Sequence, residues 1–184
     1  MGTKNINLGC GFEPLPGFIN VDSNPNANAD VFEDILKYIT RTTSFSIDHL
    51  IADNVIEHLS ITEEHLFFRN AVRALKEHGK LELMVPDLEW ACKKFAEATE
   101  NNFEWYQSGA KDHYFGGGMD VSKRWSYLLA TIYGHQNGPG QVHKNGYTKG
   151  KFKSIGKEFG LKIDTLENYM RKTAQCIRVV YIKS

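Results

Sequence analysis

The chain has few cysteines and no long apolar run. Its three cysteines, Cys10, Cys92 and Cys176, lie far apart among 184 residues and form no CxxC pair. We therefore expect neither a disulfide scaffold nor a cysteine-built zinc site, and this cysteine usage fits a reducing, cytoplasmic environment. No apolar run approaches the roughly 20 residues that cross a bilayer, and the N-terminus lacks the apolar stretch of a signal peptide. We expect neither a secreted nor a membrane protein.

No charge of one sign dominates the chain. Its 22 basic residues cancel 22 acidic ones, whereas proteins that coat nucleic acid or anionic membrane depend on net positive charge. We therefore expect neither nucleic acid nor membrane as a partner. The chain is 41% hydrophobic and 24% charged, and 184 residues are short for two domains, so residues 1–184 are predicted to form one globular domain.

Strands and helices alternate along the chain, which predicts an α/β fold with a mostly parallel sheet. Strands are expected at about 4–8, 18–21, 29–32, 47–52, 81–85, 162–166 and 176–182. One helix is predicted from the capping-box spacing of Ser60 and Glu63 to a stop at Gly79, and another from Thr148 to Gly160.

The stretch 87–147 is long enough to form a helical lid inserted in the domain. Asp87 is expected to cap a helix whose inner face is Leu88, Ala91, Cys92 and Phe95. A flexible joint is expected at 116–118 and a further helix from Ser122. The aromatic residues at about 105–115 are candidate walls for a flat or sugar-like acceptor.

A glycine pair follows the first predicted strand, and an acidic residue ends the second. Gly9 and Gly11 let the backbone pass close to a ligand, since they carry no Cβ. Asp22 is positioned to accept hydrogen bonds from the two hydroxyls of a ribose. The alternative interpretation is a plain tight turn and a solvated aspartate.

The motif departs from the dinucleotide-binding fingerprint G-x-G-x-x-G. Pro14 stands where the third glycine belongs, and with Pro16 it prevents the helix whose N-terminus binds a pyrophosphate. Gly9 and Asp22 are 13 positions apart, against about 20 in folds that bind NAD. A cofactor with a ribose but no pyrophosphate fits this pattern better than NAD.

With these motifs in place, the sequence resembles the class I S-adenosylmethionine (SAM)-dependent methyltransferases, in particular small bacterial and phage-type members. The matching stretches are Asn7–Gly11, Ile19–Asp22, Asp30–Ile35, Ile51–Leu59, Gly79–Asp87 and His143–Thr148. They cover most of the chain in the order of that class. The resemblance implies a Rossmann-like, mostly parallel seven-stranded sheet with an antiparallel last strand, shortened first crossovers and a helical insertion after the fifth strand.

The resemblance also implies SAM as the cofactor. Gly9, Cys10 and Gly11 would pass under its methionine part, and Asp22 would hold its ribose hydroxyls. Because the first crossovers are too short for full helices, one face of the sheet is expected to be thinly covered, and a homodimer is one way to cover it.

Four further residues complete the cofactor site that the resemblance implies. Asp34 and the backbone of Ile35 would meet the adenine, and Asn54 would lie beside the methionine end. Asn7 takes the position before the glycines where the class often has an acidic residue.

Glu57 and His58 have two interpretations. Methyltransferases of ubiquinone synthesis and of small-RNA terminal methylation bind a divalent metal through Glu-x-x-Glu-His, and here Asn54 replaces the first glutamate. His135 or His143 could supply a further ligand. We favour the alternative, a loop without a metal in which His58 is bonded to the backbone.

The expected function is methyl transfer from SAM to an unidentified acceptor, a small molecule or saccharide rather than nucleic acid. His58, His143 and Tyr147 are the catalytic candidates, because a histidine near neutral pH can take a proton from an acceptor hydroxyl. The alternative for His143 is a loop residue that caps the next helix. A non-catalytic SAM-binding or partner-binding module and a nicotinamide-dependent oxidoreductase stay open.

Overall fold

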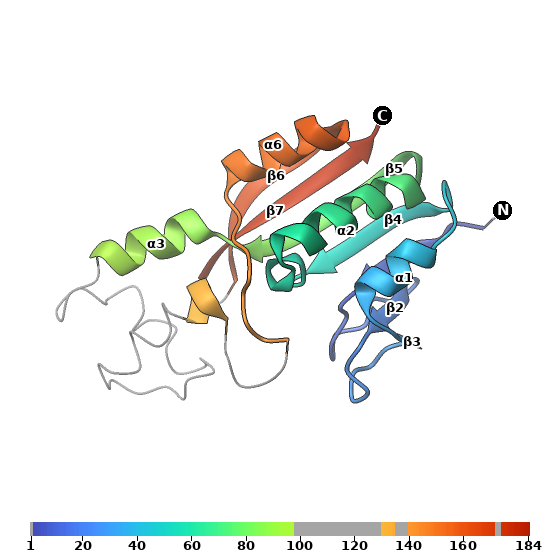
Figure 1. Cartoon of the computed structure of the whole chain (residues 1–184), viewed down its shortest axis with the longest axis horizontal. Helices are drawn as coiled ribbons and strands as arrows, with labels where there is room; N and C mark the ends of the chain where they lie inside the picture. Colours follow the sequence, from blue (N-terminus) through green and yellow to red (C-terminus); the bar gives the residue numbers. More distant parts are fainter. Residues whose placement is uncertain (1, 98–129, 135–139, 172–173) are drawn as a thin grey trace.

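The computed structural model describes residues 2–97, 130–134, 140–171 and 174–184 (Figure 1). The strands are β1 (Asn5–Leu8), β2 (Ile19–Asp22), β3 (Val31–Phe32), β4 (Ile47–Asp53), β5 (Leu75–Pro86), β6 (Leu161–Arg171) and β7 (Ala174–Lys183). The helices are α1 (Ile35–Arg41), α2 (Ile61–Ala74), α3 (Leu88–Glu97) and α6 (Lys149–Phe159), and a 3₁₀ turn, η1, covers Ile56–His58.

The seven strands form one sheet in the order β3-β2-β1-β4-β5-β7-β6. The pairs from β3 to β5 are parallel, and β7 runs antiparallel to both of its neighbours. The expected α/β class, with a mostly parallel seven-stranded sheet and an antiparallel last strand, is confirmed. As in every parallel sheet, the carboxyl ends of β1, β2, β4 and β5 meet at one edge.

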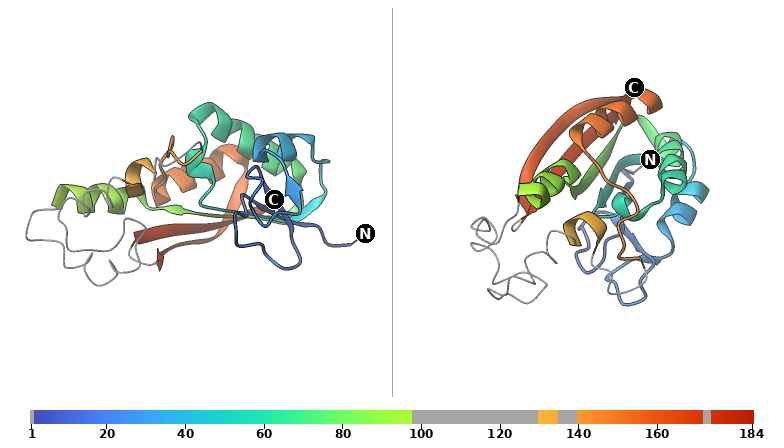
Figure 2. Two further views of the ribbon diagram at one scale, coloured as in Figure 1. Left: turned by 90° about the horizontal axis from the view of Figure 1, so that it is seen from below. Right: turned by 60° about the vertical axis from the view of Figure 1, so that its left-hand side comes forward.

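The first two crossovers carry no helix. Residues 9–18 and 23–30 connect β1 to β2 and β2 to β3 by turns alone, which confirms the prediction of shortened crossovers. Helices α1, α2 and α6 lie side by side on one face of the sheet (Figure 2). Among the described residues no helix covers the opposite face.

Polar side chains take the place of helices on part of that opposite face. Leu81 and Leu83 of β5 are fully buried in the core on the helix side, and Glu82 between them points the other way. The Glu82 carboxylate lies 3.0 Å from Nε2 of His49 on β4 and accepts a 2.7 Å hydrogen bond from Arg178 on β7. This row of polar side chains spans three strands, so this part of the face carries polar groups where a helix would otherwise pack. The structure contains one chain, and the expected homodimer stays a prediction.

The predicted helix caps are present. Ser60 and Glu63 form both bonds of a capping box at the start of α2. The Thr148 side chain accepts the Lys151 amide at the start of α6, and Gly160 ends that helix in the left-handed conformation at φ 65°. These caps depend only on residues within one turn, which is why the sequence predicts them.

The predicted stop of α2 at Gly79 is wrong. The helix ends at Ala74, because Leu75 already pairs with Ile47 as the first residue of β5. Gly79 instead lies inside β5, where the register with β4 shifts. A Cβ there would lie 2.9 Å from the carbonyl oxygen of Lys76, so close packing of the backbone in this bulge requires glycine.

The predicted inner face of α3 is only partly correct. Asp87 caps the helix through the amides of its first turn, and Ala91 is buried. Cys92 and Phe95 are exposed, because the helix continues past the end of the strands (Figure 1). None of the described helices is long and apolar enough to cross a membrane.

Several predictions about the insertion fall on residues that the structure does not describe. The joint at 116–118, the start of the helix at Ser122 and the aromatic stretch at 105–115 lie outside the described ranges. Residues 130–133 are helical. The extent of the lid, 87–147, stays a prediction.

The capping box gives a test of how α2 is held. We expect Ser60→Ala to lower the free energy of unfolding by about 0.5–2 kcal/mol, since the mutation leaves a helix N-terminal amide without its acceptor. The control is Ser154→Ala on the exposed surface of α6, where little change is expected. Urea unfolding followed by circular dichroism compares the two, and equal losses would contradict the role of the cap.

Candidate functional site

The ends of β1 and β2 are joined through the carboxylate of Asp22. Its Oδ2 accepts the amide of Gly11 and its Oδ1 the amide of Asn24, both at 2.8 Å. A carboxylate oxygen accepts about two hydrogen bonds, so each oxygen keeps capacity for one more. The half-buried side chain is therefore ready to accept two neighbouring hydroxyl groups.

The two glycines of the turn have different roles. Gly9 has φ +69°, and a Cβ on it would lie 2.3 Å from Cγ2 of Val55, so Val55 packs directly on the glycine backbone. Gly11 has φ +52°, and apart from its two chain neighbours no residue has an atom within 4 Å of the place its Cβ would take. Cys10 between them is buried, and burial raises the pKa of its thiol. Room for a ligand exists at Gly11.

The other predicted cofactor residues lie at the ends of the following strands, with one exception. Asp34 is exposed and its Oδ1 caps α1, which begins at Ile35. Asn54 follows β4 with φ +51° and donates its amide to a carbonyl of β5. Asn7 is buried, and its side-chain amide donates to Oδ1 of Asn20 at 3.0 Å, so this nitrogen serves the interior of the sheet.

The loop 140–147 is bonded to the turn that follows β4. The backbone carbonyl of Glu57 accepts the amides of Lys144 at 2.9 Å and Asn145 at 3.1 Å. Nδ1 of His58 lies 3.1 Å from the carbonyl oxygen of Val142, so the expected bond from His58 to the backbone is present. These contacts bring together two parts of the chain that are far apart in sequence.

The two histidine candidates meet as a result. The ring centroids of His58 and His143 are 4.9 Å apart with the rings edge to face, and both side chains are half-buried. His135 lies outside the described residues. Of the two histidines named as possible further ligands, His143 is the one that the structure places next to Glu57 and His58.

Tyr147 lies in the core of the molecule. Its side chain is fully buried, its ring stacks on Phe152 and its hydroxyl donates to the carbonyl of Ile56 at 3.2 Å. Burial raises the pKa of this phenol above its ordinary range, so the group serves as a hydrogen-bond donor that holds the turn. A direct catalytic role for Tyr147 stays a prediction.

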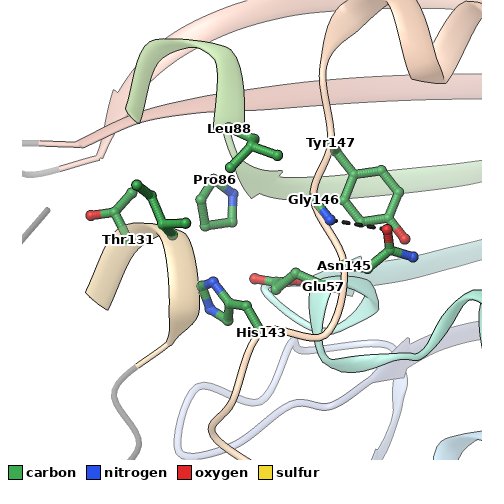
Figure 3. A pocket seen from close by; sticks show the side chains of 9 residues that line it. Glu57, Pro86, Leu88, Thr131, His143, Asn145, Gly146 and Tyr147 are labelled. Carbon is green, nitrogen blue, oxygen red and sulfur yellow. Dashed lines mark hydrogen bonds between the residues drawn. The ribbon is translucent and has the colours of Figure 1, made fainter. Parts of the chain in front are cut away.

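Glu57 has an unusual environment for a carboxylic acid. Its side chain is 2% exposed, and neither carboxyl oxygen has a hydrogen-bond partner among the described residues. Burial raises the pKa of Glu57 to about 8. The carboxyl group points toward His143 across a small pocket (Figure 3). The pocket is lined by Glu57, Pro86, Leu88, Thr131, Ile132, His143, Asn145, Gly146 and Tyr147.

Two features of this region were not predicted from the sequence: the burial of Glu57 and an ion pair at the edge of the sheet. The burial of Glu57 depends on the loop 140–147, and spacing along the chain gives no sign of it. Arg171 at the end of β6 forms an ion pair with Asp53 at the end of β4. Despite that pairing, burial raises the pKa of Asp53.

Solved structures of methyltransferases share this fold. A SAM-dependent methyltransferase from Archaeoglobus fulgidus is 13% identical with a TM-score of 0.61, over 99% of this chain and 87% of that one. One from Methanosarcina mazei is 12% identical with a TM-score of 0.58, over 100% and 94%. Magnesium protoporphyrin IX methyltransferase from Synechocystis, solved with bound S-adenosylhomocysteine (SAH), is 11% identical with a TM-score of 0.56, over 100% and 75%.

No family model matches the sequence, and no curated protein matches it. The similarity to solved structures therefore defines the fold, which is that of the class I SAM-dependent methyltransferases. At 11–13% identity it carries no residue roles.

The contact between Gly9 and Val55 is open to a direct test. We expect Gly9→Ala to destabilise the protein more than Gly17→Ala, since both glycines have positive φ but only Gly9 lacks room for a Cβ. The strain of positive φ alone costs about 1–2 kcal/mol, and the collision with Val55 adds to it. Urea unfolding of both variants measures the difference. Equal losses would contradict the close contact.

The Tyr147 hydroxyl gives a second test. Tyr147→Phe removes the donor to the buried carbonyl of Ile56, and we expect a loss of about 0.5–1.5 kcal/mol in the free energy of unfolding. Tyr133→Phe is the matched control, because Tyr133 is 53% exposed. A loss no larger than that of the control would show that the bond does not hold the turn.

Proposed function

We propose that the protein is a SAM-dependent methyltransferase that acts on a small molecule or saccharide. The observation that carries the proposal is Asp22, which ends β2 with both carboxylate oxygens held by backbone amides and with capacity left for a ribose diol. It does so in a seven-stranded sheet whose fold is shared by SAM-dependent methyltransferases of known structure.

The residues at this edge fit SAM. Gly11 leaves open space beside Asp22, where a side chain would otherwise stand. In this proposal Asp22 holds the ribose hydroxyls, the turn of Gly9, Cys10 and Gly11 lies under the methionine, and Asn54 lies beside its far end. Asp34 and Ile35, where α1 begins, contact the adenine. Asn7 acts indirectly by fixing β2 through Asn20.

The same region fits NAD less well. Residues 12–18 after the glycine turn contain no helix, so no helix N-terminus faces the place where a pyrophosphate would bind. This favours SAM over the nicotinamide-dependent alternative.

When bound, SAM supplies a methyl group on a positively charged sulfur that is already activated for displacement. The main task of the protein is then to align the acceptor and to exclude water. Since a carbonyl oxygen only accepts, the 3.1 Å contact with Val142 places the proton of neutral His58 on Nδ1 and the lone pair on Nε2. Either His58 or His143 takes the proton of an acceptor hydroxyl; an acceptor that is already nucleophilic needs no base.

The acceptor class rests on two points. The chain has no net charge for binding a polyanion, and the Synechocystis neighbour acts on a porphyrin, a small molecule. The insertion 87–147 is proposed to determine which acceptor binds.

A non-catalytic SAM-binding module is the alternative to an enzyme. Such a module would bind the cofactor and methylate none of the acceptors offered.

Calorimetric titration with SAM and SAH tests this proposal. We expect wild-type protein to bind both, and Asp22→Ala to bind each at least tenfold more weakly, because hydrogen bonds to a charged group are worth about 1.5–3 kcal/mol. Asp164→Ala on the exposed surface of β6 is the control and should bind like wild type.

Circular dichroism confirms that the variants are folded, and titration with NAD tests the oxidoreductase alternative. No binding of SAM or SAH to folded wild-type protein would reject the proposal. Binding of NAD alone would favour the oxidoreductase.

A further inference from the structure

The buried carboxyl group of Glu57 lacks a partner that its burial calls for. A buried carboxyl group is normally hydrogen-bonded, paired with a cation or bound to a metal, because its removal from water without a partner is costly. Glu57 is 2% exposed, and neither of its oxygens accepts a hydrogen bond from any described residue. The carboxyl group points into the pocket of Figure 3, toward His143. A buried carboxyl group without a partner, aimed at an imidazole, is a candidate ligand for a cation.

Two imidazole groups lie within reach of the same point. One ligand atom from each of Glu57, His58 and His143 lies within 4.8 Å of the other two. In a tetrahedral site with bonds of about 2.1 Å the ligand atoms are roughly 3.4 Å apart, so small rotations of the half-buried imidazoles close the difference. The carboxylate comes from the interior and the imidazoles from the solvent side.

Backbone hydrogen bonds hold the three residues close to one another. The amides of Lys144 and Asn145 donate to the carbonyl of Glu57, and the carbonyl of Val142 meets Nδ1 of His58. These bonds lie on both sides of His143 in the sequence and hold it against the turn. Histidine ligands in proteins characteristically donate the second ring N–H to such a carbonyl, so His58 is oriented as a metal ligand would be.

We propose, in place of the metal-free loop expected from the sequence, that Glu57, His58 and His143 bind one divalent transition-metal ion, with Zn²⁺ as the preferred ion. With the ion bound, the imidazole lone pairs of both histidines are engaged as ligands, and the base role proposed above applies only to the metal-free chain. Two imidazole nitrogens and one carboxylate oxygen are ligands that suit Zn²⁺ and its first-row neighbours, whereas Mg²⁺ prefers oxygen ligands alone. Three protein ligands leave a coordination position open to the pocket.

The pocket has room for that open position. Its volume is about 10 Å³, which is roughly the space that one water molecule occupies. Pro86 and Leu88 form an apolar part of its wall, and Thr131 lies across from His143 (Figure 3). A water or a single oxygen of a substrate fits there as the fourth ligand.

Metal binding to the full chain, freed of metal by a chelator, tests the proposal without any assay of methyl transfer. We expect calorimetry with ZnCl₂ to give one site per chain, bound more tightly than MgCl₂. Glu57→Gln and His143→Gln should weaken Zn²⁺ binding by more than the roughly 10–100-fold that loss of a supporting residue costs. His65→Gln is the matched control, because His65 is an exposed histidine of α2, and its Zn²⁺ affinity should equal that of wild type.

Thermal unfolding gives a second readout that needs no folded Glu57 variant. Zn²⁺ should raise the Tm of wild type and of His65→Gln by mass action, and should leave the Tm of His143→Gln unchanged. The proposal is overturned if folded wild-type chain binds no Zn²⁺ stoichiometrically. It is also overturned if His143→Gln responds to Zn²⁺ as wild type does, or if His65→Gln loses the response.

Discussion

Two backbone hydrogen bonds to the carbonyl of Glu57 hold the candidate site together. The amides of Lys144 and Asn145 donate them, and through them the loop that precedes α6 lies on the turn that follows β4. The parallel sheet brings the ends of its strands to one edge, but that alone would not bring a residue of a distant loop to them. With these bonds, His143 lies against His58 and over the carboxyl group of Glu57.

The two halves of the site are connected by a close contact. On one side Asp22 and the glycine turn form the region proposed for SAM, and on the other η1 and the loop 140–147 carry the histidines. Val55, one residue before η1, packs on the backbone of Gly9. A side chain at Gly9 would push the halves apart. The requirement for glycine at this position therefore comes from the protein itself.

Local signals in the sequence were sufficient for much of the fold. The caps at Ser60, Thr148 and Gly160 and the turn at Gly9 depend on residues close in the chain, and all are present. The stop of α2 could not be predicted in this way, because Leu75 leaves the helix to pair with β4.

The same distinction between local and long-range interactions applies to the candidate site. Asp22 could be proposed as a binding residue because it ends the strand that follows a glycine pair. The partnerless carboxylate of Glu57 could not, because its burial depends on a loop more than eighty residues away. The exposure of Cys92 and Phe95 on α3 likewise depends on where the sheet ends.

A titration of isotope-labelled protein with SAM, followed by ¹H–¹⁵N NMR, tests the central claim most directly. The proposal predicts saturable shifts of the amides at the carboxyl ends of β1 and β2, above all those of Gly11 and Asn24, which are bonded to Asp22. Amides of β6, far from Asp22 in the sheet order, should stay unchanged. Folded protein whose Gly11 and Asn24 amides do not shift at saturating SAM would contradict the proposed cofactor site.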